Sequence, residues 1–433
     1  MESSSKKNPI AASISWSHFR DLNYIIFKIH QWELLLPTRS DMKHSILNKS
    51  IRFFAKLIIN ILYDLINCRK IQFNIHSKFV FLGHSSSSKE VLGPLVVRYG
   101  QDAIFIETVE KFNKQGKRLP QSVVYLLSIL MLPIFLYHLF IMSTLERRSS
   151  FWFLPTILMS YGTDIYWKVV LTFNKPIAIF VANDHSFETR SPVLAARKKG
   201  IPVFYIQHAP VTKLFPPLVF DIAFLEGENA LQCYNVKESN QVILVGNIKF
   251  EMVRHLRNKK TTVNVIGIAG SSFLTKATFH HLVEIISYTF KELKIIFRPH
   301  PDGVHKDWSI PKSIEFSDVR IENSFTFLAR IDLVIGGESG ILAEAALMNV
   351  YPIMYGKENS NVTAIDSYGF IENNVCDLAK NEKDLLEIIR QTIKKKENSV
   401  DRVSYYYSNT VKPFGSDPYG RIIEIVNNYL RNN

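Results

Sequence analysis

Residues 332–348 read Asp332-Leu-Val-Ile-Gly-Gly-Glu-Ser-Gly-Ile-Leu-Ala-Glu-Ala-Ala-Leu-Met348, and Val350-Tyr-Pro-Ile-Met-Tyr355 follows one residue later. The apolar run at 333–335 stops at two glycines, which is how a buried parallel strand ends at a turn. Ser339 is a residue type that caps helix N-termini, and apolar residues recur beyond it at helical spacing. The run at 350–355 resumes a strand pattern. This stretch therefore predicts a strand, a glycine turn, a helix and a second strand.

A turn of this kind favours phosphate binding. Its backbone N–H groups, from Gly337 through Glu338 and Ser339 to Gly340, are expected at the carboxyl edge of a sheet, where the helix dipole adds partial positive charge. Glu344 follows one helical turn later and is placed to reach past a phosphate toward a ribose hydroxyl. The alternative is an ordinary βαβ crossover whose glycines only make the turn.

Composition limits the class of protein. A chain of 433 residues is too long for one ordinary core, so two or three domains are expected. The three cysteines form no CxxC pair and no His/Cys cluster, which indicates a reducing compartment and no structural zinc. The net charge is +13, and residues 1–80 hold 12 Lys and Arg against 5 Asp and Glu. Such a basic end indicates an anionic partner, either membrane lipid or nucleic acid; the sequence carries no recognised nucleic-acid-binding motif, so no nucleic acid is expected.

Two apolar segments bear on membrane contact. Residues 53–66 follow an amphipathic helical pattern flanked by Lys and Arg, typical either of a helix on a membrane or of one packed on the protein core. Residues 119–145 contain no Asp, Glu, Lys or Arg, which is long enough for a transmembrane helix, but Pro133 interrupts them. A single crossing would also separate strands predicted on either side of it. We therefore expect two broken helices, buried or dipped into one leaflet, in a protein attached peripherally to the cytoplasmic face of the cell membrane.

Six apolar runs predict the strands of a first α/β domain, at residues 78–83, 103–107, 177–182, 201–206, 220–225 and 242–247. Polar residues follow three of these runs: His84 the first, Asp184 and His185 the third, and His208 the fourth. Parallel strands present their carboxyl ends at one edge, where ligands bind in doubly wound folds. A lone histidine is usually structural, but three such strand ends on one sheet predict a cleft.

A second α/β series is expected beyond the polar residues 254–262. Residues 263–269 predict a strand that ends at Gly270-Ser271, and residues 294–298 predict a strand whose end carries Arg298 and His300. Further elements are expected as helices at 277–290, 324–330, 382–396 and 419–431 and a short strand at 320–321.

The predicted fold class is α/β, with two Rossmann-like doubly wound domains facing a central cleft and additional N-terminal helices. The predicted boundaries are 1–75 for a basic helical extension that faces a membrane, 76–255 for the first domain with a helical insertion at 119–172, 256–415 for the second domain, and 416–433 for a C-terminal helix.

Five short motifs, in this order and spacing, resemble glycosyltransferases of the GT-B type, especially bacterial surface-polysaccharide enzymes and the related CDP-glycerol phosphotransferases. They are Tyr205-Ile-Gln-His-Ala209, Asp221-Ile-Ala-Phe-Leu-Glu-Gly227, Val245-Gly-Asn247, Arg298-Pro-His-Pro301 and Gly337-Glu-Ser-Gly340. The resemblance covers roughly residues 176–375 and does not reach the N-terminal 75. The acidic motif of bacterial sialyltransferases is missing, with Asn183-Asp184-His185 as its nearest substitute. The Ser-Gly-Gly turn of nonhydrolysing nucleotide-sugar 2-epimerases is replaced by the Gly337–Gly340 turn.

The resemblance implies a donor domain and an acceptor domain. Arg298, His300, Gly270, Ser271 and the Gly337–Gly340 turn would bind the pyrophosphate of a nucleotide sugar, the substrate, with no separate cofactor and, since no Asp-x-Asp site is present, no metal. The acceptor would be a growing surface glycan of the capsule, O-antigen or lipopolysaccharide type, free or lipid-linked.

The acceptor hydroxyl needs a base, and the first domain offers four residues for this role. Asp184 is the first choice, because it follows the most apolar strand of that domain and partial burial would raise its pKa. His208 is the second choice, and His185 and His84 are the remaining candidates. A CDP-glycerol-type polyol phosphotransferase, a nonhydrolysing 2-epimerase and a noncatalytic binding protein stay open as alternatives.

Overall fold

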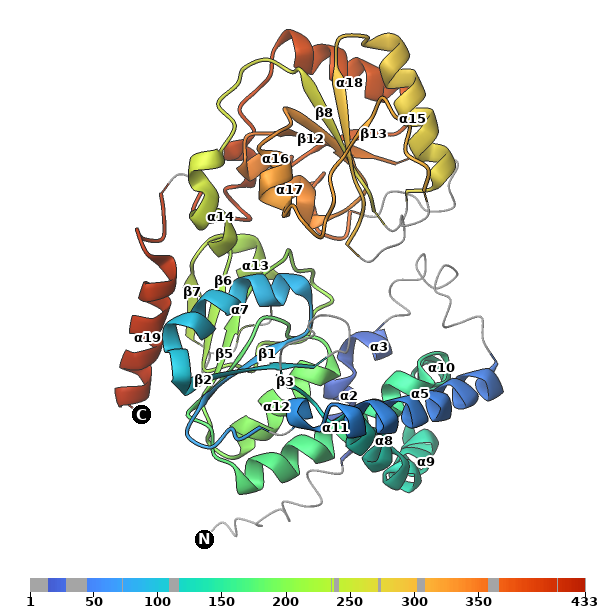
Figure 1. The fold of residues 1–433 in the computed structure, drawn as a ribbon, viewed down its shortest axis with the longest axis vertical. Coiled ribbons are helices and arrows are strands. Elements are labelled where there is room, and N and C mark those ends of the chain that lie inside the picture. The colour runs from blue at the N-terminus through green and yellow to red at the C-terminus, as the bar shows by residue number, and fades with distance from the viewer. Residues whose placement is uncertain are drawn as a thin grey trace.

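The computed structural model describes residues 15–28, 45–71, 73–108, 117–234, 236, 241–271, 274–301, 308–356, 366–410 and 412–432. Two α/β domains are stacked along the long axis of the molecule (Figure 1). Each domain is built on one parallel sheet with helices on both faces, which confirms the predicted fold class.

The first sheet has seven parallel strands in the order β3-β2-β1-β4-β5-β6-β7. Their bounds are β1 Phe79–Gly83, β2 Ala103–Glu107, β3 Lys117–Arg118, β4 Ala178–Val181, β5 Val203–Ile206, β6 Ile222–Leu225 and β7 Gln241–Leu244. The six apolar runs predicted six of these strands. The seventh, β3, consists of two charged residues that pair with β2 at the sheet edge, so it carries no apolar signal.

The second sheet has six parallel strands in the order β10-β9-β8-β11-β12-β13. Their bounds are β8 Val265–Ala269, β9 Lys294–Arg298, β10 Glu315–Phe316, β11 Leu333–Gly336, β12 Tyr351–Tyr355 and β13 Asp377–Ala379. The prediction of a strand at 320–321 is wrong, because Arg320 turns back to pair with Asp318 and the edge strand is β10 instead.

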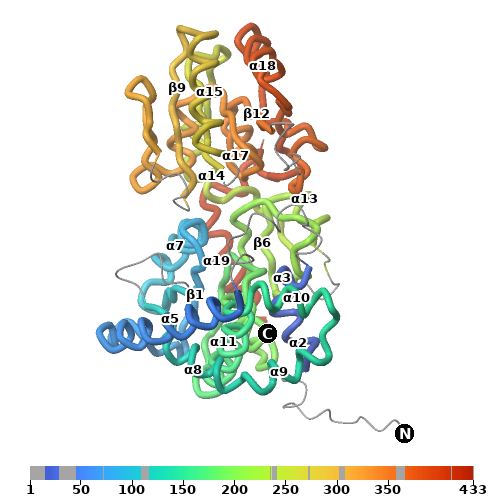
Figure 2. Tube along the Cα trace, turned by 90° about the vertical axis from the view of Figure 1, so that its right-hand side faces the viewer, coloured from blue at the N-terminus to red at the C-terminus, as the bar shows by residue number. Residues whose placement is uncertain are grey.

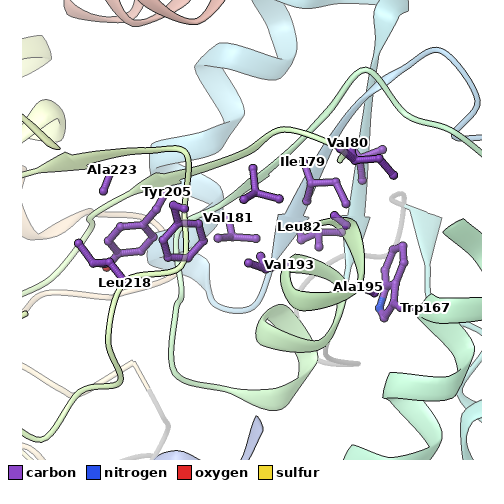
Figure 3. Packing of buried hydrophobic residues seen from close by; sticks show 14 of the residues in the cluster. Val80, Leu82, Trp167, Ile179, Val181, Val193, Ala195, Tyr205, Leu218 and Ala223 are labelled. Atoms are coloured by element: carbon purple, nitrogen blue, oxygen red, sulfur yellow. The ribbon is translucent and has the colours of Figure 1, made fainter. Parts of the chain in front are cut away.

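Apolar side chains cover both faces of each sheet. On one face of the first sheet, α11 (Leu154–Phe173) and α12 (Phe187–Lys198) pack against β1 and β4. Figure 3 shows this cluster, in which Trp167 of α11 and Ala195 of α12 lie below Val80, Leu82 and Ile179 of the strands in this view. On the other face lie α7 (Ser86–Tyr99) and α19 (Pro418–Asn432). In the second domain α15 (Lys276–Thr289) and α18 (Glu382–Lys394) cover one face, and α16 (Ser324–Leu328) and α17 (Gly340–Leu347) the other.

The chain crosses between the domains twice. It leaves the first domain through α14 (Ile248–Val253) and returns after residue 400, so that α19 packs on the first domain (Figure 1). At this junction the side chain of Asn409 accepts a hydrogen bond from the Asn247 backbone at 2.9 Å. Gly246 has φ +72° there, and a Cβ on it would lie 2.0 Å from the Asn409 side chain, so this close approach requires glycine.

Helices outside the sheets gather on the first domain. They are α2 (Trp16–Leu22), α3 (Tyr24–Lys28), α5 (Ile46–Ile66), α6 (Cys68–Ile71), α8 (Gln121–Leu130), α9 (Leu132–Ile141), α10 (Thr144–Trp152) and the start of α11. Residues 119–145 form two helices broken at Met131, as predicted, with 56° between α8 and α9. Within the described ranges no single helix is both long and apolar enough to cross a membrane, whereas this bent pair passes that test by length and composition.

Candidate functional site

The site of the second domain lies where its strand order reverses. β9 follows β8 on one side of the sheet, whereas β11 lies on the other side of β8, so the carboxyl ends of β8 and β11 flank a topological switch point. Doubly wound folds bind ligands at this position. Gly270 and Ser271 follow β8, and the predicted glycine turn follows β11. A Cβ on Gly337 would lie 2.6 Å from the Ser271 hydroxyl, so glycine lets the two loops meet.

The glycine turn opens a helix as predicted. Ser339 occupies the N-cap position of α17, but its hydroxyl caps no backbone N–H, so side chain and helix N-terminus are both available to a ligand. Glu338 is engaged elsewhere, since its carboxylate accepts a hydrogen bond from the Tyr368 backbone at 2.8 Å. Burial raises the pKa of Glu338, and that hydrogen bond opposes the shift. The turn therefore offers N–H groups and one hydroxyl rather than a free carboxylate.

Arg298 and His300 supply a cationic side chain and an imidazole beside the turn. Arg298 ends β9, is 6% exposed, and donates from Nη1 to the Ser317 hydroxyl at 2.9 Å. Ser317 in turn hydrogen-bonds Glu322, which also pairs with Arg330. Burial lowers the pKa of Arg298, and Glu322 and other nearby carboxylates oppose this. The guanidinium is thus held in one place before any ligand binds.

The opposite wall comes from the first domain and contains residues that the sequence analysis missed. Lys249 of α14 lies 2.9 Å from Glu344 of α17 and joins the two domains through a largely buried ion pair. Burial disfavours the charge of Lys249, but attraction by Glu344, Glu90 and Glu226 outweighs it and raises its pKa. Burial raises the pKa of Glu226 to about 8, with Lys249 opposing. Glu344, expected near a ribose, is paired with Lys249 in this structure.

Together these residues enclose an interdomain cleft of about 610 Å³. The predicted residues that line it are His208, Gly270, Ser271, Arg298, His300, Glu338, Ser339, Gly340 and Glu344. Gly337 lies outside this lining and supports it through its contact with Ser271. Lining residues not predicted from the sequence include Ser86, Glu90, Lys249, Tyr368 and Tyr407. The glycine turn and the ends of β5, β8 and β9 therefore converge on one cleft.

Three of the four predicted base candidates lie at the switch point of the first domain, between β1 and β4. His84 follows β1, and Asp184 and His185 follow β4; the His185 Nδ1 lies 3.1 Å from the Asp184 carboxylate. Burial and then the charge of His185 lower the pKa of His84 to about 4. These three residues do not line the cleft, and Asp184 is only 2% exposed.

His208 is the base candidate that lines the cleft. Burial, reinforced by Lys249, lowers its pKa to about 4, although a hydrogen bond with the Ala182 backbone opposes the shift. Its imidazole is therefore neutral at neutral pH. Within the described residues its buried Nδ1 has no hydrogen-bond partner. A buried ring nitrogen without a partner is an exception among protein polar groups and calls for an explanation.

Among the residues that the structure describes, no group of three or more His, Cys, Asp or Glu side chains is placed to hold a metal ion. The expectation of metal-independent chemistry stays a prediction.

No protein-family model matches the sequence, and a search of curated proteins found no match. Solved structures are similar to it. A putative UDP-N-acetylglucosamine 2-epimerase from Listeria monocytogenes has a TM-score of 0.51 at 13% identity, over 83% of this chain and 98% of that one. The corresponding epimerase from Rickettsia bellii has a TM-score of 0.52 at 12% identity, over 82% and 98%. The calicheamicin glycosyltransferase CalG4 has a TM-score of 0.52 at 11% identity, over 82% and 98%. The likeness shows the fold, which is the two-domain GT-B fold expected from the motifs.

Proposed function

We propose that this chain is a glycosyltransferase that moves a sugar from a nucleotide-sugar donor to a growing surface glycan. One observation carries the proposal. Arg298, His300 and the turn that opens α17 converge at the switch point of the second domain, across one cleft from His208 of the first. One wall therefore carries groups that bind anions, and the other carries a proton acceptor. Sugar transfer needs both, because the leaving nucleotide is an anion and the attacking hydroxyl must lose its proton.

The donor pyrophosphate fits the second-domain wall. In the transfer, the bond between the anomeric carbon and the phosphate oxygen breaks, and the electron pair leaves with the nucleoside diphosphate. Arg298 donates N–H groups to the negative charge that develops there, and the backbone N–H groups at the start of α17 do the same. Because Ser317 already fixes Arg298, little reorganisation is needed when this charge appears.

The acceptor hydroxyl attacks the anomeric carbon and loses its proton to the first-domain wall. His208 is our choice for this base, because it lines the cleft and Nδ1 is unpartnered in the described structure. Its low pKa makes it a weak base, but an anionic donor nearby would raise that pKa toward neutrality. Asp184, preferred from the sequence, is buried beside His185 and does not line the cleft, so we do not choose it.

The first alternative is a nucleotide-sugar 2-epimerase, because two of the similar structures named above are 2-epimerases. A CDP-glycerol-type phosphotransferase is a further alternative implied by the motif resemblance. The three activities release different products. A glycosyltransferase leaves the sugar without phosphate on the acceptor and releases a nucleoside diphosphate, or CMP from a CMP-linked donor. A CDP-polyol phosphotransferase releases CMP and leaves a phosphate on the acceptor, and an epimerase releases neither and inverts one sugar carbon.

The experiment is to incubate the purified chain with UDP-, GDP-, CDP- and CMP-linked donors and a glycan acceptor mixture, and to identify products by mass spectrometry. We expect acceptor-dependent release of a nucleoside diphosphate. Release of CMP with phosphate retained on the acceptor, or a new sugar epimer without any released nucleotide, would replace this proposal with one of the alternatives.

A further inference from the structure

Helix α5 has the reverse of the usual polarity of a surface helix. Its face toward the protein buries Lys49, Asn60 and Asp64 together with Phe53 and Leu57. The Lys49 ammonium donates to the carbonyls of Phe151 and Trp152 at 2.9 and 2.8 Å, where α10 ends. Polar groups inside a protein cost free energy unless they are paired, so this inward face is a specific polar interface.

Polar contacts also hold the C-terminal half of the inward face of α5. Asp64 pairs with Arg118 at 3.1 Å and accepts hydrogen bonds from the backbone and hydroxyl of Ser122 at 2.8 and 2.7 Å. Arg118 also donates to the Asn60 side chain at 3.1 Å. These contacts fix the rotation of α5 about its axis, so its apolar side faces outward.

That outward side carries nine large apolar residues, each between 52% and 81% exposed. They are Ile46, Leu47, Ile51, Phe54, Ile58, Ile59, Leu62, Leu65 and Ile66. A helix packed only on a protein core would bury such residues and expose the polar ones. The core-packing interpretation of this segment therefore explains only its inner face.

Helices α8 and α9 extend the exposed apolar area. α8 packs on α5, with the rings of Phe53 and Tyr125 4.8 Å apart. Leu130 is 72% exposed, and Tyr137 and Phe140 of α9 are 62% and 84% exposed. Figures 1 and 2 both show α5, α8 and α9 together on the first domain, away from the second. We call the outward side chains of these three helices the apolar face; contiguous areas of this kind mark interaction sites.

The charges on α5 and α6 favour an anionic partner for the apolar face. Arg52, Lys56 and Arg69 are exposed along α5 and α6, and the one acidic residue in 46–71 is Asp64, which is buried and paired with Arg118. A second copy of this chain docked by a two-fold axis would set these cations near each other. An anionic bilayer instead offers acyl chains to the apolar residues and negative headgroups to the cations.

We propose that the apolar face binds an anionic lipid bilayer, with α5, α8 and α9 lying at the boundary between headgroups and acyl chains. Strand β1 precedes α8 and α9 in the chain, and β4 follows them. Because β1 and β4 pair in one sheet, with Leu82 opposite Val181, both ends of this helical segment lie on one side of the membrane. The proposal is independent of the transferase activity. Attachment through the first domain holds the second domain away from the bilayer (Figure 1).

The test is flotation of the full chain with vesicles of phosphatidylcholine and phosphatidylglycerol, compared with vesicles of phosphatidylcholine alone. Binding is expected to the anionic vesicles and to weaken in high salt. The variant Ile58→Glu/Leu62→Glu should bind at least tenfold more weakly, since it removes apolar contact and adds repulsive charge. Tyr288→Glu is the matched control, because Tyr288 is 81% exposed on α15 of the second domain, and it should bind like the wild type.

A second readout does not depend on the folding of a variant. Cys68 is exposed at the end of the apolar face, so an environment-sensitive dye on it, in a Cys233→Ser background, should shift to the blue with anionic vesicles. Equal vesicle binding by wild type and by a correctly folded Ile58→Glu/Leu62→Glu variant would overturn the proposal. So would a solution dimer that this variant dissociates, because the face would then belong to a second copy.

Discussion

Replacing Arg298 by Met tests the donor wall most cleanly. Within the described residues Ser317 takes one of the five guanidinium N–H groups, so the others remain for phosphate oxygens. A hydrogen bond from a charged donor contributes ~1.5–3 kcal/mol, and each 1.4 kcal/mol is tenfold in affinity. The variant should therefore bind the nucleoside diphosphate product roughly 10- to 150-fold more weakly.

The same substitution should leave stability nearly unchanged. Methionine keeps the apolar stem, and burial lowers the pKa of Arg298, which means that burying its charge costs free energy. Glu322 keeps a cationic partner in Arg330, at 2.9 Å. Titration calorimetry gives the affinity and scanning fluorimetry the melting temperature. Arg390→Met is the matched control, because Arg390 lies on α18, outside both the cleft lining and the hydrogen-bonded network around Arg298, so its loss should spare nucleotide affinity. Unchanged affinity in a well-folded Arg298→Met variant would refute the assignment.

Three further predictions address the cleft. His300→Ala should weaken nucleotide binding by roughly one to two decades at a nearly constant melting temperature; a large loss of stability with unchanged affinity would make His300 structural. His208→Ala should lower the transfer rate by ~10²–10⁴ while donor binding persists, and Asp184→Asn should lower it less; the reverse order would make Asp184 the base. Because burial raises the pKa of Glu226 to about 8, the folded state holds a proton there that the unfolded chain, with a pKa of 4.5, has lost. Stability should thus fall by roughly 1 kcal/mol per pH unit from pH 6 to 8, and Glu226→Gln should remove that contribution; equal slopes in both proteins, measured by denaturant titration, would count against a protonated Glu226.

Most strands of the two sheets were predictable, because a buried parallel strand is recognisable in the sequence as a run of apolar residues. The strand ends could also be predicted, since a parallel sheet brings its carboxyl ends to one edge, and Arg298, His300 and the Gly337–Gly340 turn do meet there. The strands β10 and β13, at the two edges of the second sheet, are only two and three residues long, so periodicity could not find them. Arg320 was misassigned because its ion pair with Asp318 closes a turn, and such a contact leaves no periodic signal.

Apart from His208, the opposite wall of the cleft was not predictable from local sequence. Lys249 and Glu90 lie on helices, and only the packing of α14 and α7 around the interdomain junction brings them to the cleft. A charged residue on a helix is usually solvated, so nothing in the pattern distinguished these two. The amphipathic pattern of α5 likewise predicted two faces but not which one turns inward. The pairing of Asp64 with Arg118 decides that, and Arg118 lies far away in the sequence.

The central claim is that the interdomain cleft binds a nucleotide-linked sugar, and the melting temperature of the full chain with CMP, CDP, UDP and GDP tests it most directly. Ligand at 100 times its dissociation constant stabilises the folded state by ~2.7 kcal/mol. We predict that one nucleoside diphosphate raises the melting temperature of the wild type and of Arg390→Met equally, and that of Arg298→Met much less. A 10- to 150-fold weaker affinity leaves only ~0.3–1.4 kcal/mol of stabilisation at the same concentration. No shift with any of the four nucleotides, or an equal shift in all three proteins, would contradict the account.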